Sequence, residues 1–297
     1  MFPIFAVLRS RADVTRFSTH EDMSVWLSTT MIQALRNLVD LFTFYFDVLG
    51  RMIDRLLDLL CECICQENDT LARIGTACLQ QLVEKNVRKL SPDLWERIVS
   101  TFITLFHTTT ASQLFDPRLR QPYQSTGDTP SEELSQPGAF VPPLPLSPGV
   151  VEGGRTEDEA MAGGTAGPPL PAAERKRAFR QIIVKCVLQL LLIETSHELL
   201  GNELVYSTIP AAELLKLMRV LDESYRFAKR FNADKDLRMA LWHVGFMKQL
   251  PNLLKQESSA AATLVSVLLR SYADTREDHV AKRPETVAAF MPCVVAV

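Results

Sequence analysis

The chain has 297 residues and a formal net charge of −3, with 47% apolar and 23% charged residues. This length suffices for one large domain or two ordinary ones, and the composition is that of a folded globular protein. The near-neutral charge argues against a dedicated nucleic-acid binder, whose surface carries a surplus of Lys and Arg. No stretch has the pattern of a membrane span or a signal peptide. We therefore expect a cytosolic or nuclear protein.

Residues 21–110 carry apolar side chains at helical spacing. One stripe advances in steps of three and four through Leu49, Met52, Ile53, Leu56, Leu60, Cys63 and Ile64. Two further stripes begin at Leu71 and Leu94. Ser91 and Pro92 supply a capping hydroxyl followed by proline at the first helical position. The pattern predicts helices packed in antiparallel pairs.

Three of the six cysteines, Cys61, Cys63 and Cys65, alternate within one apolar run. On a helix, Cys61 and Cys65 share a face while Cys63 points elsewhere, so the three cannot ligate one ion. We interpret the cysteines as small buried apolar residues and expect neither a metal nor a cofactor.

Residues 116–173 differ from the rest of the chain in composition. They hold 11 of the 17 Pro and 8 of the 12 Gly residues and only two aromatic residues. Such a segment cannot bury enough apolar surface to offset its ordering entropy, which predicts a disordered linker. The run 141–148, VPPLPLSP, favours the polyproline II conformation that SH3 and WW domains bind. Short matches of this kind arise readily in proline-rich linkers, so docking stays an open question.

Helical spacing returns in residues 174–275. Apolar residues from 179 to 191 define one helix, Pro210 opens a second, and residues 232–234 separate it from a shorter third. We expect Pro251 to start the last helix. Its inward-facing residues are predicted to be Leu254, Ala261, Leu264, Val265, Leu268 and Tyr272. No stretch alternates in the manner of a β-strand.

The predicted fold is all-α. Helical hairpins of about 40 residues, each too small to bury its own apolar face, indicate HEAT- or armadillo-like repeats stacked into an α-solenoid. The sequence shows no crisp internal repeat, so a compact helical bundle stays open as the alternative. The predicted organisation is an N-terminal helical block at 1–115, a linker at 116–173, a C-terminal helical block at 174–275 and a tail at 276–297.

The sequence contains no phosphate-binding loop, nucleophile elbow or zinc-protease motif, and we predict no catalytic residue. Asp54 and Asp58 lie one helical turn apart, but the arginines around them favour a solvated helix face over acid–base or metal chemistry. Glu194, His197 and Glu198 share one helix face. For these three, capping or salt bridging is a better interpretation than metal ligation.

The two helical blocks differ in charge. Residues 20–115 hold 8 Lys and Arg against 12 Asp and Glu, whereas residues 174–275 hold 15 against 11. Cations gather at 175–180, where the linker ends, and again at 226–238. This asymmetry is the strongest signal of an interaction surface in the sequence.

The candidate interaction face consists of Arg226, Lys229 and Arg230, which stand at i, i+3 and i+4 of one helix beside two phenylalanines. Such a face suits an acidic protein or anionic lipid headgroups. Nucleic acid is not expected as a partner, because aromatic stacking platforms are missing. The alternative, that these cations merely face solvent or neutralise the other block, stays open.

Longer stretches of the sequence resemble a known family. Residues 67–84 (ENDTLARIGTACLQQLVE) and 91–99 (SPDLWERIV) resemble a helical repeat of the large Arf guanine-nucleotide exchange factors, the Sec-seven or brefeldin A-inhibited group of the trans-Golgi. Residues 224–248 and 251–275 resemble the final C-terminal repeats of the same proteins. With the opening residues, the resemblance covers roughly 2–116 and 174–275.

The resemblance implies a non-catalytic region. In the family, a separate domain carries exchange on a loop of the form Phe-Arg-Leu-Pro-Gly-Glu, whereas here Phe179-Arg180 is followed by Gln-Ile-Ile. The implied roles are autoregulation, self-association and recruitment in Golgi vesicle traffic. The implied partners are a small GTPase of the Arf or Rab class or other parts of the parent exchange factor, with peripheral contact at Golgi and trans-Golgi membranes. The GTPase and the oligomeric state are not predicted.

Two rival hypotheses stay open, namely a free-standing helical-repeat scaffold without a link to Arf, and a chain that itself catalyses exchange. Residues 117–173 match nothing associated with the family, and residues 279–297 are more apolar than a natural terminus. These departures lead to the hypothesis that the chain is a truncated gene model.

Overall fold

The computed structural model describes residues 20–66, 69–121 and 170–295. Within these ranges the chain is built from helices and contains no strand, which confirms the all-α prediction. The predicted disorder of the linker concerns mainly 122–169, which lie outside the described residues. The main helices are α2 (His20–Phe44), α4 (Ile53–Ile64), α5 (Asp69–Asn86), α6 (Pro92–Thr109), α7 (Ala172–Gly201), α9 (Ala211–Ala233), α11 (Leu254–Ala273) and α12 (Glu277–Val295).

Short helices connect or extend the main ones. They are α3 (Phe46–Leu49), α8 (Glu203–Thr208) and α10 (Lys235–His243), with 3-10 turns η2 (Gly50–Met52), η3 (Val87–Lys89), η4 (Ser112–Phe115) and η5 (Pro117–Leu119). None of the described helices is both long and apolar enough to cross a bilayer.

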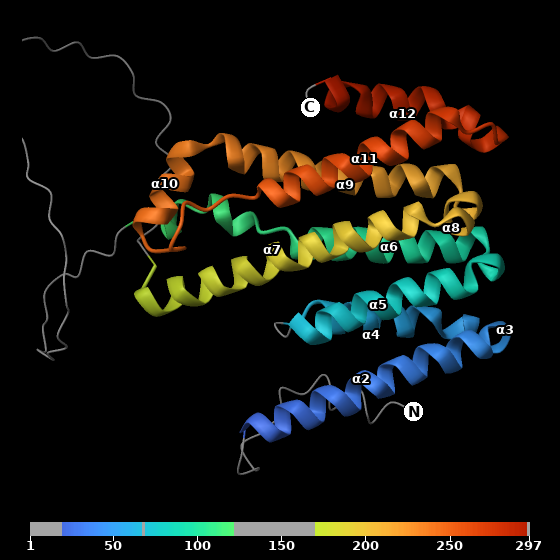
Figure 1. The fold of residues 1–297 in the computed structure, drawn as a ribbon, viewed down its shortest axis with the longest axis horizontal. Helices are drawn as coiled ribbons and strands as arrows, with labels where there is room; N and C mark the ends of the chain where they lie inside the picture. Colours follow the sequence, from blue (N-terminus) through green and yellow to red (C-terminus); the bar gives the residue numbers. More distant parts are fainter. Residues whose placement is uncertain (1–19, 67–68, 122–169, 296–297) are drawn as a thin grey trace, which may run out of the picture.

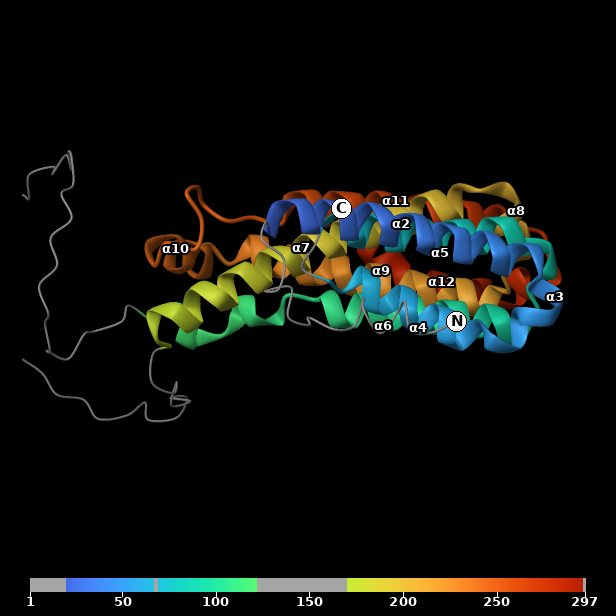
Figure 2. The ribbon, with the colours of Figure 1, turned by 90° about the horizontal axis from the view of Figure 1, so that it is seen from below.

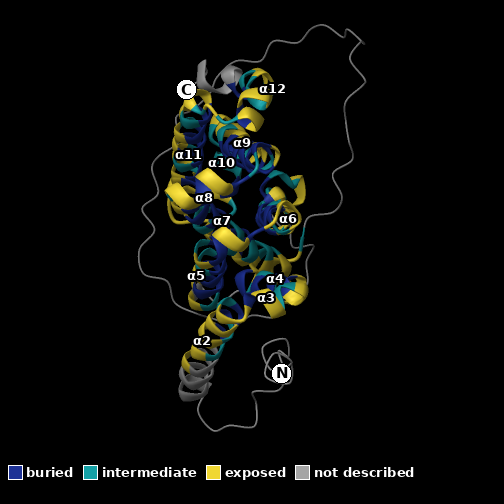
Figure 3. Ribbon diagram, turned by 90° about the vertical axis from the view of Figure 1, so that its right-hand side faces the viewer, coloured by how far each residue is buried: buried dark blue, intermediate teal, exposed yellow. Residues whose placement is uncertain are grey.

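The main helices stack in two columns, seen end-on in Figure 3. One column holds α2, α5, α7 and α11, and the other holds α4, α6, α9 and α12; successive helices within each column pack on each other. The columns are joined because α4 packs on α5, α6 on α7, and α9 on α11. Figure 1 shows the resulting layers from α2 to α12. This two-layer stack is the arrangement of HEAT-like helical repeats, as the helix lengths predicted.

Local sequence signals fix several helix ends. The Ser91 hydroxyl accepts a hydrogen bond from the backbone N–H of Leu94 at 3.4 Å, and Pro92 occupies the first turn of α6. Pro210 directly precedes α9. Asp234 separates α9 from α10, where its carboxylate accepts from the backbone N–H of Leu237 at 2.8 Å. Each cap satisfies a backbone donor that the helix itself leaves unpaired.

A single hydrophobic core continues from the helices before residue 122 to those after residue 169. Leu60, Leu105, Leu192, Leu221 and Phe290 are among its buried members. Direct packing of α5 and α6 on α7, and of α6 on α9, carries this core across the junction. A second, smaller cluster around Phe179, Phe231 and Phe246 lies where α7 begins and α10 ends. The two helical blocks therefore pack together as one stack.

The ordered chain extends beyond the predicted helical blocks in two places. Leu119 of η5 is buried, and α7 begins at Ala172, so both ends of the segment 116–173 belong to the stack. The segment 276–297 contains α12, which packs on α9 and α11. α12 contains Pro284, which lacks the N–H that a helix interior uses.

The predicted inward face of α11 is partly wrong. Leu254 and Tyr272 are 59% and 63% exposed, whereas the polar residues Gln256, Thr263 and Ser271 are buried. The helix also begins at Leu254 rather than Pro251. An apolar stripe predicts the buried face of a helix only where the polar residues of that helix face solvent. In α11 the polar residues form hydrogen bonds inside the stack, so they are buried as well.

Candidate functional site

Of the described cysteines, Cys61, Cys63, Cys78 and Cys186 are buried or half-buried, whereas Cys65 is exposed, contrary to the prediction. Cys63 and Cys78 are buried, and burial raises the pKa of the Cys63 thiol to about 12 and that of Cys78 to about 11. Burial likewise raises the pKa values of Cys61 and Cys186 to about 12. Thiols with such pKa values stay protonated at neutral pH and do not act as nucleophiles. Within the described residues, no cluster of three or more His, Cys, Asp or Glu side chains is placed to hold a metal ion.

Of Glu194, His197 and Glu198, the first two contact α11, and the three form no metal-holding group among the described residues. Glu194 pairs with Lys255 of α11 at 3.2 Å. The Nδ1 atom of His197 lies 3.3 Å from the hydroxyl of Thr263, also on α11. These contacts agree with the salt-bridging interpretation of the sequence.

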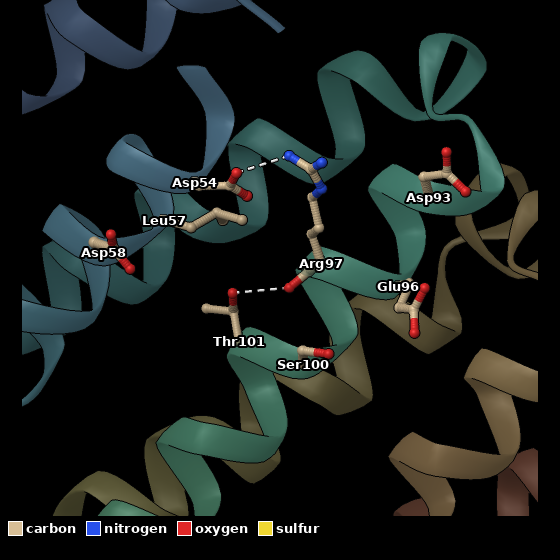
Figure 4. Close-up of a pocket in the computed structure, with 8 residues that line it drawn as sticks. All are labelled: Asp54, Leu57, Asp58, Asp93, Glu96, Arg97, Ser100 and Thr101. Carbon is tan, nitrogen blue, oxygen red and sulfur yellow. Dashed lines mark hydrogen bonds and ion pairs between the residues drawn. The ribbon is translucent and has the colours of Figure 1, made fainter. Parts of the chain in front are cut away.

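An acidic groove of about 490 Å³ lies between α4 and α6. Asp54 and Asp58 line one wall, and Asp93, Glu96 and Arg97 line the other; Figure 4 shows the carboxylates spread along the groove rather than pointing at one spot. The guanidinium of Arg97 pairs with the Asp54 carboxylate at 2.7 Å. The groove has a net negative charge, and no described histidine lines it beside the hydroxyls of Ser100 and Thr101.

The predicted face on α9 is held by contacts within the chain. Arg226 donates through Nε to the Asp222 carboxylate at 2.6 Å. The Lys229 ammonium donates to the Tyr225 hydroxyl at 2.8 Å and lies 5.3 Å from the centre of the same ring. Arg226 stays exposed, whereas Lys229 is half-buried. The structure thus keeps the two cations on neighbouring positions of α9 but fixes each with a different partner.

Arg230 completes the face through an aromatic contact. Its guanidinium carbon lies 4.2 Å from the ring centre of Phe115, a cation–π distance. The same ring makes edge-to-face contacts with Phe227 at 5.5 Å and Phe231 at 6.2 Å. Phe115 comes from η4, more than 100 residues away in the chain, so no local pattern predicts this contact.

A second groove, of about 370 Å³, adjoins this face between α6 and α9. Phe106 and Phe227 give it apolar walls, while His107 and Glu223 lie at its rim with Nε2 and Oε2 atoms 3.1 Å apart. Phe227 belongs both to the groove and to the aromatic cluster beneath Arg230. The face therefore combines exposed guanidinium groups with a neighbouring cavity, a combination that the sequence analysis missed because α6 and α9 meet only in the fold.

Comparison with known proteins shows which sequences this chain is similar to. The family model described as the BIG2 C-terminal domain matches residues 187–297. The Saccharomyces cerevisiae ADP-ribosylation factor guanine nucleotide-exchange factor SEC7 is 39% identical over 93% of this chain. The chain is homologous to a short region of the large Arf guanine-nucleotide exchange factors. The Schizosaccharomyces pombe exchange factor sec72 is 38% identical over 91% of the chain.

Brefeldin A-inhibited guanine nucleotide-exchange protein 1 from Homo sapiens is 29% identical over 84% of the chain. The chain spans 14 to 16% of the length of these three relatives. These matches confirm the family resemblance of the sequence. The family model also includes residues 276–297, which the sequence analysis had left outside the resemblance.

Proposed function

We propose that the chain is a non-catalytic regulatory and interaction region of an Arf guanine-nucleotide exchange factor in Golgi vesicle traffic. The observation that carries the proposal is the match to the yeast exchange factor, which covers 93% of the chain but 16% of the relative. The family's exchange loop, Phe-Arg-Leu-Pro-Gly-Glu, does not occur in the sequence. Stacked helical repeats provide extended binding surfaces.

The surface proposed for this role consists of Arg226, Lys229 and Arg230 with the groove beside them. An activated small GTPase of the Arf or Rab class, or an acidic part of the parent protein, would meet the exposed guanidinium groups and place an apolar side chain in the groove between α6 and α9. Charge complementarity would speed the encounter and fix its orientation. The proposed location is the cytoplasmic side of Golgi and trans-Golgi membranes, held there by these contacts.

The test is the triple charge reversal R226E/K229E/R230E in the full chain. We expect weaker binding to a GTPase loaded with a GTP analogue and weaker Golgi association, with an unchanged helical circular dichroism spectrum. The matched control reverses three exposed arginines in the first half of the stack, Arg36, Arg51 and Arg88. Equal binding and localisation of the two variants would show that the α9 face is not the contact.

A further inference from the structure

One end of the stack concentrates positive charge outside the α9 face. It is formed by residues 116–121, 172–180 and 234–248, which together hold nine Lys and Arg against four Asp and Glu. Figures 1 and 2 show the start of α7 and α10 at this end, where α7 projects past the beginning of α5. We call this surface the basic end.

The three segments of the basic end are fixed to one another. The rings of Phe179 and Phe246 lie 4.9 Å apart, which joins α7 to the loop after α10. Arg175 donates to the backbone carbonyl of Gln121 at 3.1 Å, which joins α7 to the segment after η5. Leu119 belongs to the same apolar cluster as the two rings. The cations of this end therefore stand on one rigid surface.

Folding alone does not account for three of these cations. Lys176, Arg177 and Arg180 are exposed, and none of them forms an ion pair with any described residue. They place positive charge in the second and third turns of α7. Lys176 and Arg180 also repel each other at i and i+4. An arrangement that is unfavourable for the isolated helix points to an anionic partner.

Exposed apolar side chains lie at the same end of the stack, on α10 and the loop after it (Figures 1 and 2). Trp242 at the end of α10 is 40% exposed and Met247 on the following loop is 46% exposed, with Lys248 next to it. Gly245 turns the chain between them with φ of 79°, a conformation that glycine adopts without strain. The Trp242 indole donates to the Lys248 carbonyl at 3.4 Å. Tryptophan next to lysine is the composition of surfaces that sit at a bilayer interface.

We infer that the basic end binds the surface of an anionic lipid bilayer. Lys176, Arg177, Arg180 and Lys248 would contact the headgroups, and Trp242 and Met247 would enter the interfacial layer. A bilayer fits better than an acidic protein because exposed cations without an ion pair and exposed apolar side chains share this end of the stack, as in surfaces that sit at a bilayer interface. This contact uses other residues than the α9 face, so the two can fail independently.

The test is flotation of the full chain with vesicles of phosphatidylcholine and phosphatidylserine, compared with vesicles of phosphatidylcholine alone. We expect binding to the mixed vesicles only. Because each Lys or Arg near an anionic surface strengthens binding about fivefold, K176Q/R177Q/R180Q should lower the partition coefficient roughly 100-fold. The matched control R36Q/R51Q/R88Q removes the same charge from the first half of the stack and should change the partition coefficient only a few-fold.

Tryptophan fluorescence gives a second readout. Mixed vesicles should shift the emission of the chain to the blue, and W242F should lose this shift.

Three results would overturn the inference: the chain does not float with mixed vesicles, it floats equally with neutral ones, or K176Q/R177Q/R180Q and R36Q/R51Q/R88Q bind alike. Binding to polyglutamate without vesicle binding would assign the surface to an acidic protein and overturn it too. Thermal unfolding shows whether each variant is folded. The basic-end variant should bind the GTPase as the unmodified chain does, and this result separates the lipid test from the test of the α9 face.

Discussion

Gln189 of α7 ties together the helices that precede residue 122 and those that follow residue 169. It is 2% exposed, and its amide donates to the Phe106 carbonyl at 2.6 Å and to the Thr109 hydroxyl at 2.9 Å, both on α6. Its carbonyl accepts from the Ser224 hydroxyl of α9 at 2.9 Å. Ser224 in turn accepts from Gln256 of α11 at 3.0 Å. This network joins four helices inside the core.

The substitution Gln189→Leu keeps most of the side-chain volume and removes both polar groups. The Phe106 carbonyl keeps a donor, the Thr110 hydroxyl at 2.8 Å, so it is not left unpaired. The Ser224 hydroxyl loses its acceptor in a buried site. Two lost hydrogen bonds at about 1 kcal/mol each and one unpaired buried hydroxyl at about 1–3 kcal/mol predict a loss of about 2–4 kcal/mol in unfolding free energy, allowing for partial relaxation.

Urea unfolding followed by circular dichroism measures this loss. The matched control is Gln33→Leu on the exposed side of α2, which should change the unfolding free energy by less than about 0.5 kcal/mol. Adding Ser224→Ala to Gln189→Leu removes the unpaired hydroxyl, so the double variant should be more stable than the sum of the single effects predicts. A Gln189→Leu effect as small as that of the control, or strict additivity, would refute the argument that this network joins the two parts of the stack.

Three further predictions follow from the packing. Gly75→Ala should lower the free energy of unfolding by about 1–3 kcal/mol, since its new Cβ would lie 2.8 Å from a side-chain carbon of α4. In Gly201→Ala the new Cβ meets nothing within 4 Å, so this variant should raise the free energy of unfolding by about 0.5–1 kcal/mol. Equal thermal stability of the two variants would contradict the close packing of α4 on α5. Replacing residues 122–169 by a short Gly/Ser linker should leave the unfolding temperature unchanged, because helices on both sides of this segment share one hydrophobic core. A large drop in the unfolding temperature would contradict this prediction. A hydrogen bond from Arg276 lowers the pKa of Asp274, so the ionised carboxylate stabilises the folded state. This stabilisation is complete above about pH 4 and is lost as the pH falls through the lowered pKa. Asp274→Asn should therefore reduce the slope of unfolding free energy against pH in this range, and an unchanged slope would count against the Asp274–Arg276 pair.

Sequence patterns predicted the features that depend on near neighbours in the chain. Apolar spacing and the Ser91 cap located α6, and Pro210 located the start of α9. The pairing of helices into a HEAT-like stack followed from their lengths. The buried face of α11 was mispredicted because Gln256 and Thr263 are polar, and their burial depends on partners from other helices.

The candidate site shows the same limit. Spacing alone placed Arg226 and Arg230 on one side of a helix, and the structure leaves both exposed there. The Phe115 ring beneath Arg230 and the groove beside it come from segments distant in sequence, so no local pattern could reveal them. For the same reason, the sequence could not show that the cations at 175–180 lie at the same end of the stack as α10, which carries Trp242 (Figures 1 and 2).

The central claim is that this chain binds partners of Arf exchange without catalysing exchange. The most direct measurement is the rate of fluorescent GDP release from purified Arf with and without the full chain, at concentrations that span those of the exchange factor's catalytic domain in a parallel reaction. Our account predicts a release rate equal to that of Arf alone while the catalytic domain accelerates release. A release rate that rises with the concentration of this chain would contradict it.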